Sequence, residues 1–132
     1  MPYLLYIAVK LICYMGWCWL GLRLWQTHSA GIGKAAALGI LRLAIGVGFG
    51  IVIFVVVPAQ REDILWKYIA IYAPVRMVEW LILALIIGRK SQNRNASSFI
   101  LWCLGGIVVS FVADLASPEG VAGHFCIGRC LC

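Results

Sequence analysis

Five charged residues stand inside otherwise apolar stretches of this chain: Lys10, Arg42, Arg76, Glu79 and Asp114. A charge at the centre of a lipid bilayer costs about 2.5–3.5 kcal/mol on insertion scales, so such residues usually face the interior of a helix bundle and have a partner. Three of the five are cations and only two are anions. A bundle with a surplus interior cation is suited to binding an anion.

The stretches that carry these charges are long enough to cross a membrane. At a rise of 1.5 Å per residue, segments of about 19–23 residues span a hydrocarbon core of ~30 Å. The short connections require neighbouring helices to run antiparallel. The sequence therefore predicts an all-α fold, a polytopic integral membrane protein that is an antiparallel four-transmembrane-helix bundle. We expect a single transmembrane domain over residues 1–132, with helices at 3–25, 35–57, 66–88 and 98–116 and a tail at 117–132.

The composition excludes other classes of protein. Of the 132 residues, 64% are hydrophobic and only 12% are charged, which is about half the charged share of a soluble domain. A small soluble domain has too little interior to hide so much apolar surface. The net charge of +6 does not predict a nucleic-acid partner, because the basic residues stand singly or between the apolar stretches and form no basic surface.

The depth of each charge predicts which charges pair. Arg42 lies about 10 Å, and Glu79 about 13 Å, from the same end of the expected bundle. This match favours an ion pair between the second and third helices. Lys10 lies about 10 Å from the other end, where Asp114 is its nearest anion. These two pairs leave Arg76 as the cation without a partner.

Helical spacing brings the polar residues of each helix to one face. On the third helix, steps of four, four and three connect Tyr68, Tyr72, Arg76 and Glu79, with Pro74 among them. On the fourth helix, the same kind of spacing connects Cys103, Gly106, Ser110, Asp114 and Ser117. On the first helix it connects Lys10, Cys13, Tyr14 and Trp17. Three such stripes meeting in one bundle predict a polar interior.

The leading functional prediction is a small integral membrane protein that binds an anionic lipid, another anionic amphiphile or a small anion. Whether the protein then translocates or modifies this ligand stays open. A lipid phosphate headgroup is the natural example. Arg42 and Arg76 would hold the anion, with Lys10 nearer the surface. Glu79 would orient the arginines, and Tyr68 and Tyr72 would line the mouth of the site.

Three alternatives stay open. The charges are purely structural if Arg76 and Glu79 neutralise each other on one helix while Lys10 and Asp114 extend to the interface. The chain is an accessory or assembly subunit if its charges pair with a partner membrane protein. It is an intramembrane lipid-modifying enzyme if Ser110 acts with Asp114, or if His124 acts with a thiol of the tail, where the cysteines are Cys126, Cys130 and Cys132.

We expect no metal site and no cofactor. The tail cysteines and His124 lack the paired C-x-x-C spacing of zinc sites, and no cofactor-binding fingerprint occurs. Two of those thiols would form a disulfide if the tail lies outside the cell. On the second helix, the small residues Ala35, Gly39, Gly46 and Gly50 predict a close helix contact, either inside the bundle or in a homo-oligomer.

Basic and aromatic residues near the helix ends predict the orientation in the membrane. One side carries Arg23, Lys34, Arg89, Lys90 and Arg94, and the other carries Arg61, Lys67 and Arg129. The positive-inside rule then places both termini outside the cytoplasm, and we expect a bacterial cytoplasmic membrane. Trp66 and Trp102, each near the start of a helix, are expected to lie in the interfacial region of the bilayer.

Overall fold

The computed structural model describes residues 2–25, 31–56, 65–89 and 95–117. Each described segment is a helix, and each helix is long and apolar enough to cross a membrane. The all-α four-span bundle is therefore confirmed. The bounds are α1 (Pro2–Trp25), α2 (Ile32–Val56), α3 (Leu65–Gly88) and α4 (Ala96–Leu115). The largest difference from the expected ranges is at α2, which begins at Ile32 rather than at residue 35.

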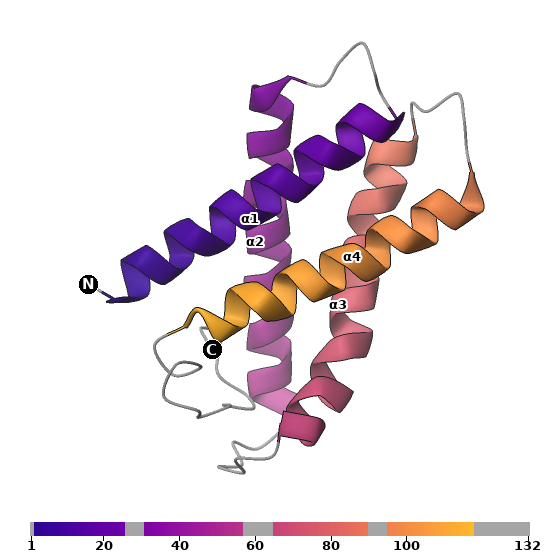
Figure 1. Ribbon diagram of the computed structural model, residues 1–132. Helices are drawn as coiled ribbons and strands as arrows, with labels where there is room; N and C mark the ends of the chain where they lie inside the picture. Colours follow the sequence, from indigo (N-terminus) through magenta and orange to yellow (C-terminus); the bar gives the residue numbers. More distant parts are fainter. Residues whose placement is uncertain (1, 26–30, 57–64, 90–94, 118–132) are drawn as a thin grey trace.

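The four helices form two layers that cross obliquely. In Figure 1, α1 and α4 lie side by side across α2 and α3, and each helix runs antiparallel to the next. The end of the bundle at which α1 and α3 start and α2 and α4 finish is called the lower end, as it lies in that view. Each helix packs on its neighbours in the sequence, and α1 also packs on α4, which closes the ring.

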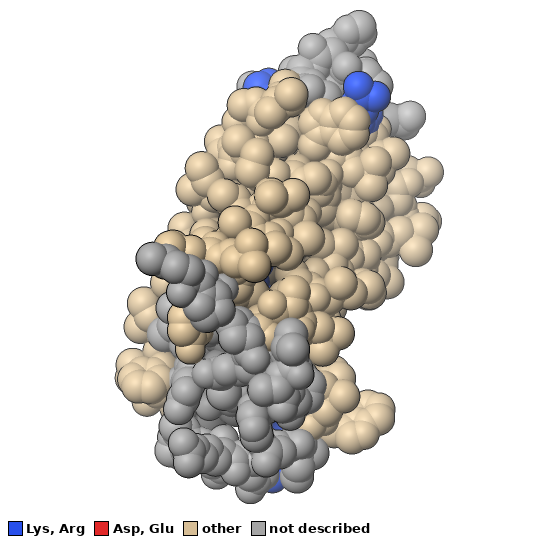
Figure 2. Space-filling model, turned by 60° about the vertical axis from the view of Figure 1, so that its left-hand side comes forward, with Lys and Arg blue, Asp and Glu red and all other residues tan. Residues whose placement is uncertain are grey.

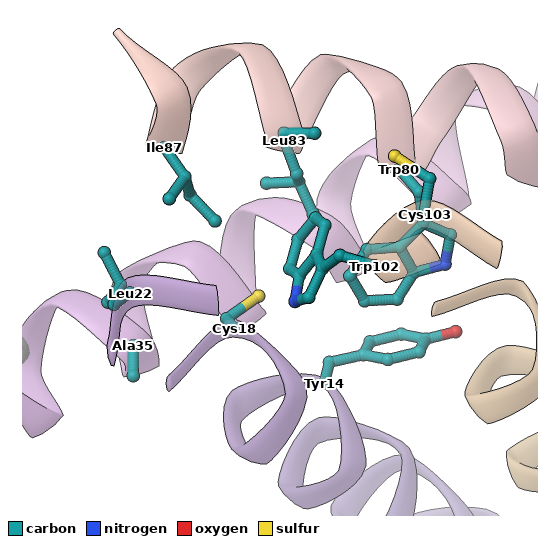
Figure 3. Packing of buried hydrophobic residues seen from close by; sticks show 10 residues of the cluster. Tyr14, Cys18, Leu22, Ala35, Trp80, Leu83, Ile87, Trp102 and Cys103 are labelled. Atoms are coloured by element: carbon teal, nitrogen blue, oxygen red, sulfur yellow. The ribbon is translucent and has the colours of Figure 1, made fainter. Parts of the chain in front are cut away.

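The upper half of the bundle has an aromatic and aliphatic core. Figure 3 shows the rings of Tyr14, Trp80 and Trp102 gathered between the helices. The rings of Trp80 and Trp102 meet edge to face, with centroids 5.2 Å apart, and Tyr14 makes a similar contact with Trp80 at 5.9 Å. Such pairs add about 0.5–1.5 kcal/mol to the benefit of burial. This core stabilises the upper half of the bundle, and the buried charged residues lie in the middle and the lower half.

Glycines bring α1 and α4 close enough for two indoles to bridge them. Trp17 donates its Nε1–H to the carbonyl of Trp102 (3.1 Å), and Trp102 donates its Nε1–H to the carbonyl of Trp17 (3.2 Å). A Cβ at Gly21 would lie 2.8 Å from the Trp102 ring, and one at Gly105 would overlap the Trp17 ring. Trp102 is consequently 3% exposed and belongs to the core, so its predicted interfacial position is wrong.

The small residues of α2 face the interior of the bundle. Ala35, Gly39 and Gly50 are buried, and a Cβ at Gly39 would lie 2.7 Å from the Met15 side chain of α1. This geometry fits packing of these small residues inside the bundle, which is one of the two contacts predicted for them.

The outer surface suits a lipid environment. Figure 2 shows a face that is almost wholly uncharged across its middle, with basic side chains at the upper end. The exposed basic residues described at that end are Arg23, Lys34 and Arg89. At the lower end Trp66 is 79% exposed, and its interfacial position stays a prediction.

Candidate functional site

Asp114, near the end of α4, is the centre of a buried polar cluster. Its Oδ1 accepts hydrogen bonds from the Tyr6 hydroxyl (2.8 Å) and from Lys10 Nζ (2.6 Å). Its Oδ2 accepts a hydrogen bond from the Tyr68 hydroxyl (3.0 Å) and forms an ion pair with Arg76 Nη2. The predicted pair of Lys10 and Asp114 is confirmed. Lys10 also donates to the Tyr6 hydroxyl at 2.8 Å, so this cluster links α1, α3 and α4 near the lower end.

A second cluster lies deeper, where Arg42 of α2 and Glu79 of α3 form the predicted ion pair. Arg42 has no exposed surface, and its guanidinium lies 4.9 Å from the Tyr14 ring centroid and 5.0 Å from that of Trp80. Aromatic faces attract a cation, and they offset part of the hydration that Arg42 loses on burial.

Arg76 is not the lone cation that the sequence suggested. It pairs with Asp114, and its Nη1 also donates to the Tyr14 hydroxyl at 3.3 Å. The prediction that Arg76 has no partner is wrong because the two oxygens of Asp114 bind different helices. Its Oδ1 binds residues of α1, and its Oδ2 binds residues of α3. Three cations still share two carboxylates, so the surplus positive charge belongs to the whole cluster rather than to Arg76.

A cavity of about 50 Å³ lies between α1, α2 and α3 and brings the three cations together. Its lining includes Lys10, Arg42, Arg76 and Glu79, and Asp114 lies outside the lining. Along α2 the lining runs from Ile53 up to Arg42, a distance of about 16 Å at the helical rise. In Figure 2 a small part of a basic side chain is visible between the apolar side chains in the middle of this face. The cavity has room for a few water-sized groups.

The two arginines that line this cavity have N–H groups without a partner among the described residues. Arg42 Nε, Arg42 Nη1 and Arg76 Nε are buried and make no hydrogen bond to any part of the chain that the structure describes. A buried charged donor without a partner carries a desolvation cost. A Cβ at residue 46 would lie 3.2 Å from Arg42 Nη1, so Gly46 keeps the space beside that nitrogen open.

The two tyrosines predicted at the mouth of the site have different positions. Tyr72 lines the cavity. Tyr68 is 4% exposed and donates to Asp114, so its predicted place at the mouth is wrong. The two rings lie 4.6 Å apart, because residues four apart on a helix are neighbours.

Sequence reasoning overlooked Tyr6 and undervalued Tyr14. Both line the cavity, and both donate to or accept from a charged member of the cluster. Each lies four residues from Lys10, so the same helical spacing that identified the other stripes contained the signal.

The residues of the enzyme alternative are engaged elsewhere or lie outside the described residues. The Ser110 hydroxyl accepts a hydrogen bond from Trp80 Nε1 at 3.0 Å and lies 3.5 Å from Arg42 Nη2. Asp114 has the four partners given above. His124 and the three tail cysteines lie beyond residue 117 and are not among the described residues.

The fold and these clusters define a small four-span membrane protein with buried salt bridges. The chain matches no family model, no curated protein and no solved structure.

Proposed function

We propose that this protein binds the anionic group of a membrane lipid or other anionic amphiphile in the cavity between α1, α2 and α3. One observation carries the proposal: Lys10, Arg42 and Arg76 line one cavity, and both arginines have buried N–H groups without a hydrogen-bond partner among the described residues. Of the two carboxylates in the clusters, only that of Glu79 lines the cavity. An anion would supply the acceptors and the negative charge that this cavity lacks.

Each cation has a distinct part in this proposal. Arg42 Nη1 and Arg76 Nε would donate charge-assisted hydrogen bonds to the anion without giving up their present ion pairs. Lys10 lies nearest the lower end and is partly exposed, so its charge would attract the anion toward the cavity. The predicted orientation places this end in the outer leaflet.

The surroundings of the cavity favour a ligand that comes from the bilayer. The lining of the cavity includes apolar side chains of α1 and α2, among them Ile7, Leu43 and Ile53, against which an acyl chain would pack. A cavity of about 50 Å³ accommodates the charged oxygens of a headgroup rather than a large polar molecule. A free small anion from solution would nevertheless bind through the same N–H groups as a lipid headgroup. The experiment therefore has to distinguish a lipid ligand from an aqueous anion.

Thermal unfolding of the purified protein in neutral detergent tests the proposal. Short-chain phosphatidylglycerol should raise the melting temperature, because a ligand that binds only the folded state stabilises it. Phosphatidylcholine with the same acyl chains is the matched control and should have no comparable effect. Sodium chloride is the third ligand, and stabilisation by chloride alone would identify an aqueous anion instead of a lipid.

The variants Arg76→Gln and Arg76→Lys complete that test. Arg76→Gln leaves Lys10 bound to Asp114, so the chain should fold and lose the shift with phosphatidylglycerol. Arg76→Lys should restore it only in part, because lysine lacks the planar fork of donors that fits a phosphate. An equal shift with both lipids, or an undiminished shift in Arg76→Gln, would contradict the proposal. Copurification with a second membrane protein would then favour the accessory-subunit interpretation.

A further inference from the structure

Gly46 of α2 leaves a space open between a donor and an acceptor of the cavity. A Cβ at this position would lie 3.2 Å from Arg42 Nη1 and 3.7 Å from Glu79 Oε1. All three residues line the cavity, and Arg42 Nη1 is buried and has no hydrogen-bond partner among the described residues. A group that binds against Gly46 would therefore meet a cationic N–H donor and a carboxylate oxygen together.

The carboxylate of Glu79 restricts the anions that suit this space. In its ion pair with Arg42 it accepts hydrogen bonds and has no proton to donate. An ionised carboxylate has about four lone-pair sites, so it can accept a further hydrogen bond and keep that ion pair. An anion without a proton would bring a second negative charge close to Glu79, in surroundings that screen charges poorly. An anion that carries an O–H group would instead donate a hydrogen bond to it.

The charge and size of the cavity define where this O–H group belongs. Lys10, Arg42 and Arg76 line the same cavity, so they would repel an ammonium group as the donor. A volume of about 50 Å³ takes the oxygens of one phosphate and leaves no room for a long headgroup beyond it. The donor is therefore best placed on the phosphate itself.

We infer that the ligand is a phosphate monoester in its monoanionic form, with its P–O–H group directed to Glu79; this inference rests on the proposed function. Its charged oxygens would accept hydrogen bonds from Arg42 Nη1 and Arg76 Nε, while the P–O–H group donates to Glu79 Oε1. Both arginines keep their present ion pairs in this arrangement, and no proton moves between ligand and protein. A phosphodiester lacks the P–O–H group and would bind more weakly.

Two lipids with the same short acyl chains test this inference on the wild-type protein. Phosphatidic acid mostly retains its P–O–H group at about pH 5.5, because a phosphate monoester loses its second proton at about pH 6. Phosphatidylmethanol has the same single charge and no O–H group. By titration calorimetry in neutral detergent, we expect a Kd for phosphatidic acid that is lower by about tenfold or more. Equal Kd values would overturn the inference and leave the proposed function intact, whereas binding of neither lipid would refute both.

A pair of glycine variants locates the binding site of the P–O–H group. Gly46→Ala places a methyl group between Arg42 and Glu79 and should remove the preference for phosphatidic acid. Gly48→Ala is the matched control and should keep it, because nothing lies within 4 Å of its Cβ position. Alanine favours a helix more than glycine does, so both variants should fold, and their melting temperatures check this. An undiminished preference in Gly46→Ala, or an equal loss in Gly48→Ala, would overturn the inference.

Inorganic phosphate distinguishes the two sources of this chemistry. At the same pH it is a monoanion that carries O–H groups and has no acyl chains. We expect phosphatidic acid to bind more tightly, because its acyl chains would pack against the apolar residues of the cavity lining. Equal affinity for inorganic phosphate would support the phosphate chemistry and overturn a lipid as its source.

Discussion

Lys10 on α1 and Arg76 on α3 bind different oxygens of one carboxylate, that of Asp114 on α4. Three helices therefore depend on a single anion for the compensation of the buried Arg76 and the half-buried Lys10. The hydroxyls of Tyr6 and Tyr68 complete the set of donors around it. Such an arrangement places two cations in the lining of a cavity, while the carboxylate that pairs with both of them lies outside that lining.

Asp114→Asn should be the most destabilising single change in this cluster. It leaves the buried Arg76 and the half-buried Lys10 without an anion, and removing one partner of a buried pair costs about 3–5 kcal/mol. Lys10→Gln should cost clearly less, because the pair of Arg76 and Asp114 remains. Unfolding measured in mixed micelles compares the two variants. Equal losses would mean that the carboxylate is not shared.

Arg42 and Glu79 should show energetic coupling. Glu79→Gln leaves a fully buried guanidinium without its counter-charge and should cost about 3–5 kcal/mol. The double variant Arg42→Gln with Glu79→Gln should recover part of that loss. A double-mutant cycle from equilibrium unfolding gives the coupling energy, and simple additivity of the two single changes would disprove the ion pair.

The contact between α1 and α4 should depend on glycine at the two indole positions. Gly105→Ala and Gly21→Ala place a methyl group against the Trp17 and Trp102 rings, and overpacking of this kind costs about 1–3 kcal/mol. Gly16→Ala on α1 is the matched control, because nothing lies within 4 Å of its Cβ position. The control should melt at or slightly above the temperature of wild type. A Gly105→Ala protein as stable as the control would contradict this packing.

The predicted orientation places the tail cysteines outside the cell. A membrane-impermeant thiol reagent should label them in intact cells after mild reduction. The helix cysteines give little background, because Cys18 and Cys103 are buried and Cys13 is half-buried. Labelling that appears only after lysis would reverse the orientation and put the cavity in the inner leaflet.

Depth along a helix was predictable from the sequence, and this is why two ion pairs were found correctly. The rise per residue fixes how far each charge lies from a helix end, and a buried charge needs a partner at a similar depth. Arg42 and Glu79 satisfied that condition, and so did Lys10 and Asp114. The rule works because a membrane bundle has few charges to choose from.

Rotation and crossing of the helices were not predictable in the same way. Asp114 binds residues of both α1 and α3 because of the rotation of α3 and α4 about their axes. The same rotation turns Tyr68 of α3 toward Asp114 and buries it. Trp102 was misplaced for a different reason. An aromatic residue near a helix end is typical of the interface, unless a glycine on another helix opens space for it. Gly21, eighty-one positions earlier in the chain, does this for Trp102.

The most direct test of the proposed site is a density map of the protein in nanodiscs that contain phosphatidylglycerol. We predict density for a phosphate within hydrogen-bond distance of Arg42 Nη1 and Arg76 Nε, with its acyl chains against the apolar outer surface. A matched map in pure phosphatidylcholine should lack a phosphate there. A cavity that holds only water in both maps, or that is filled by a neighbouring protein side chain, would contradict the account.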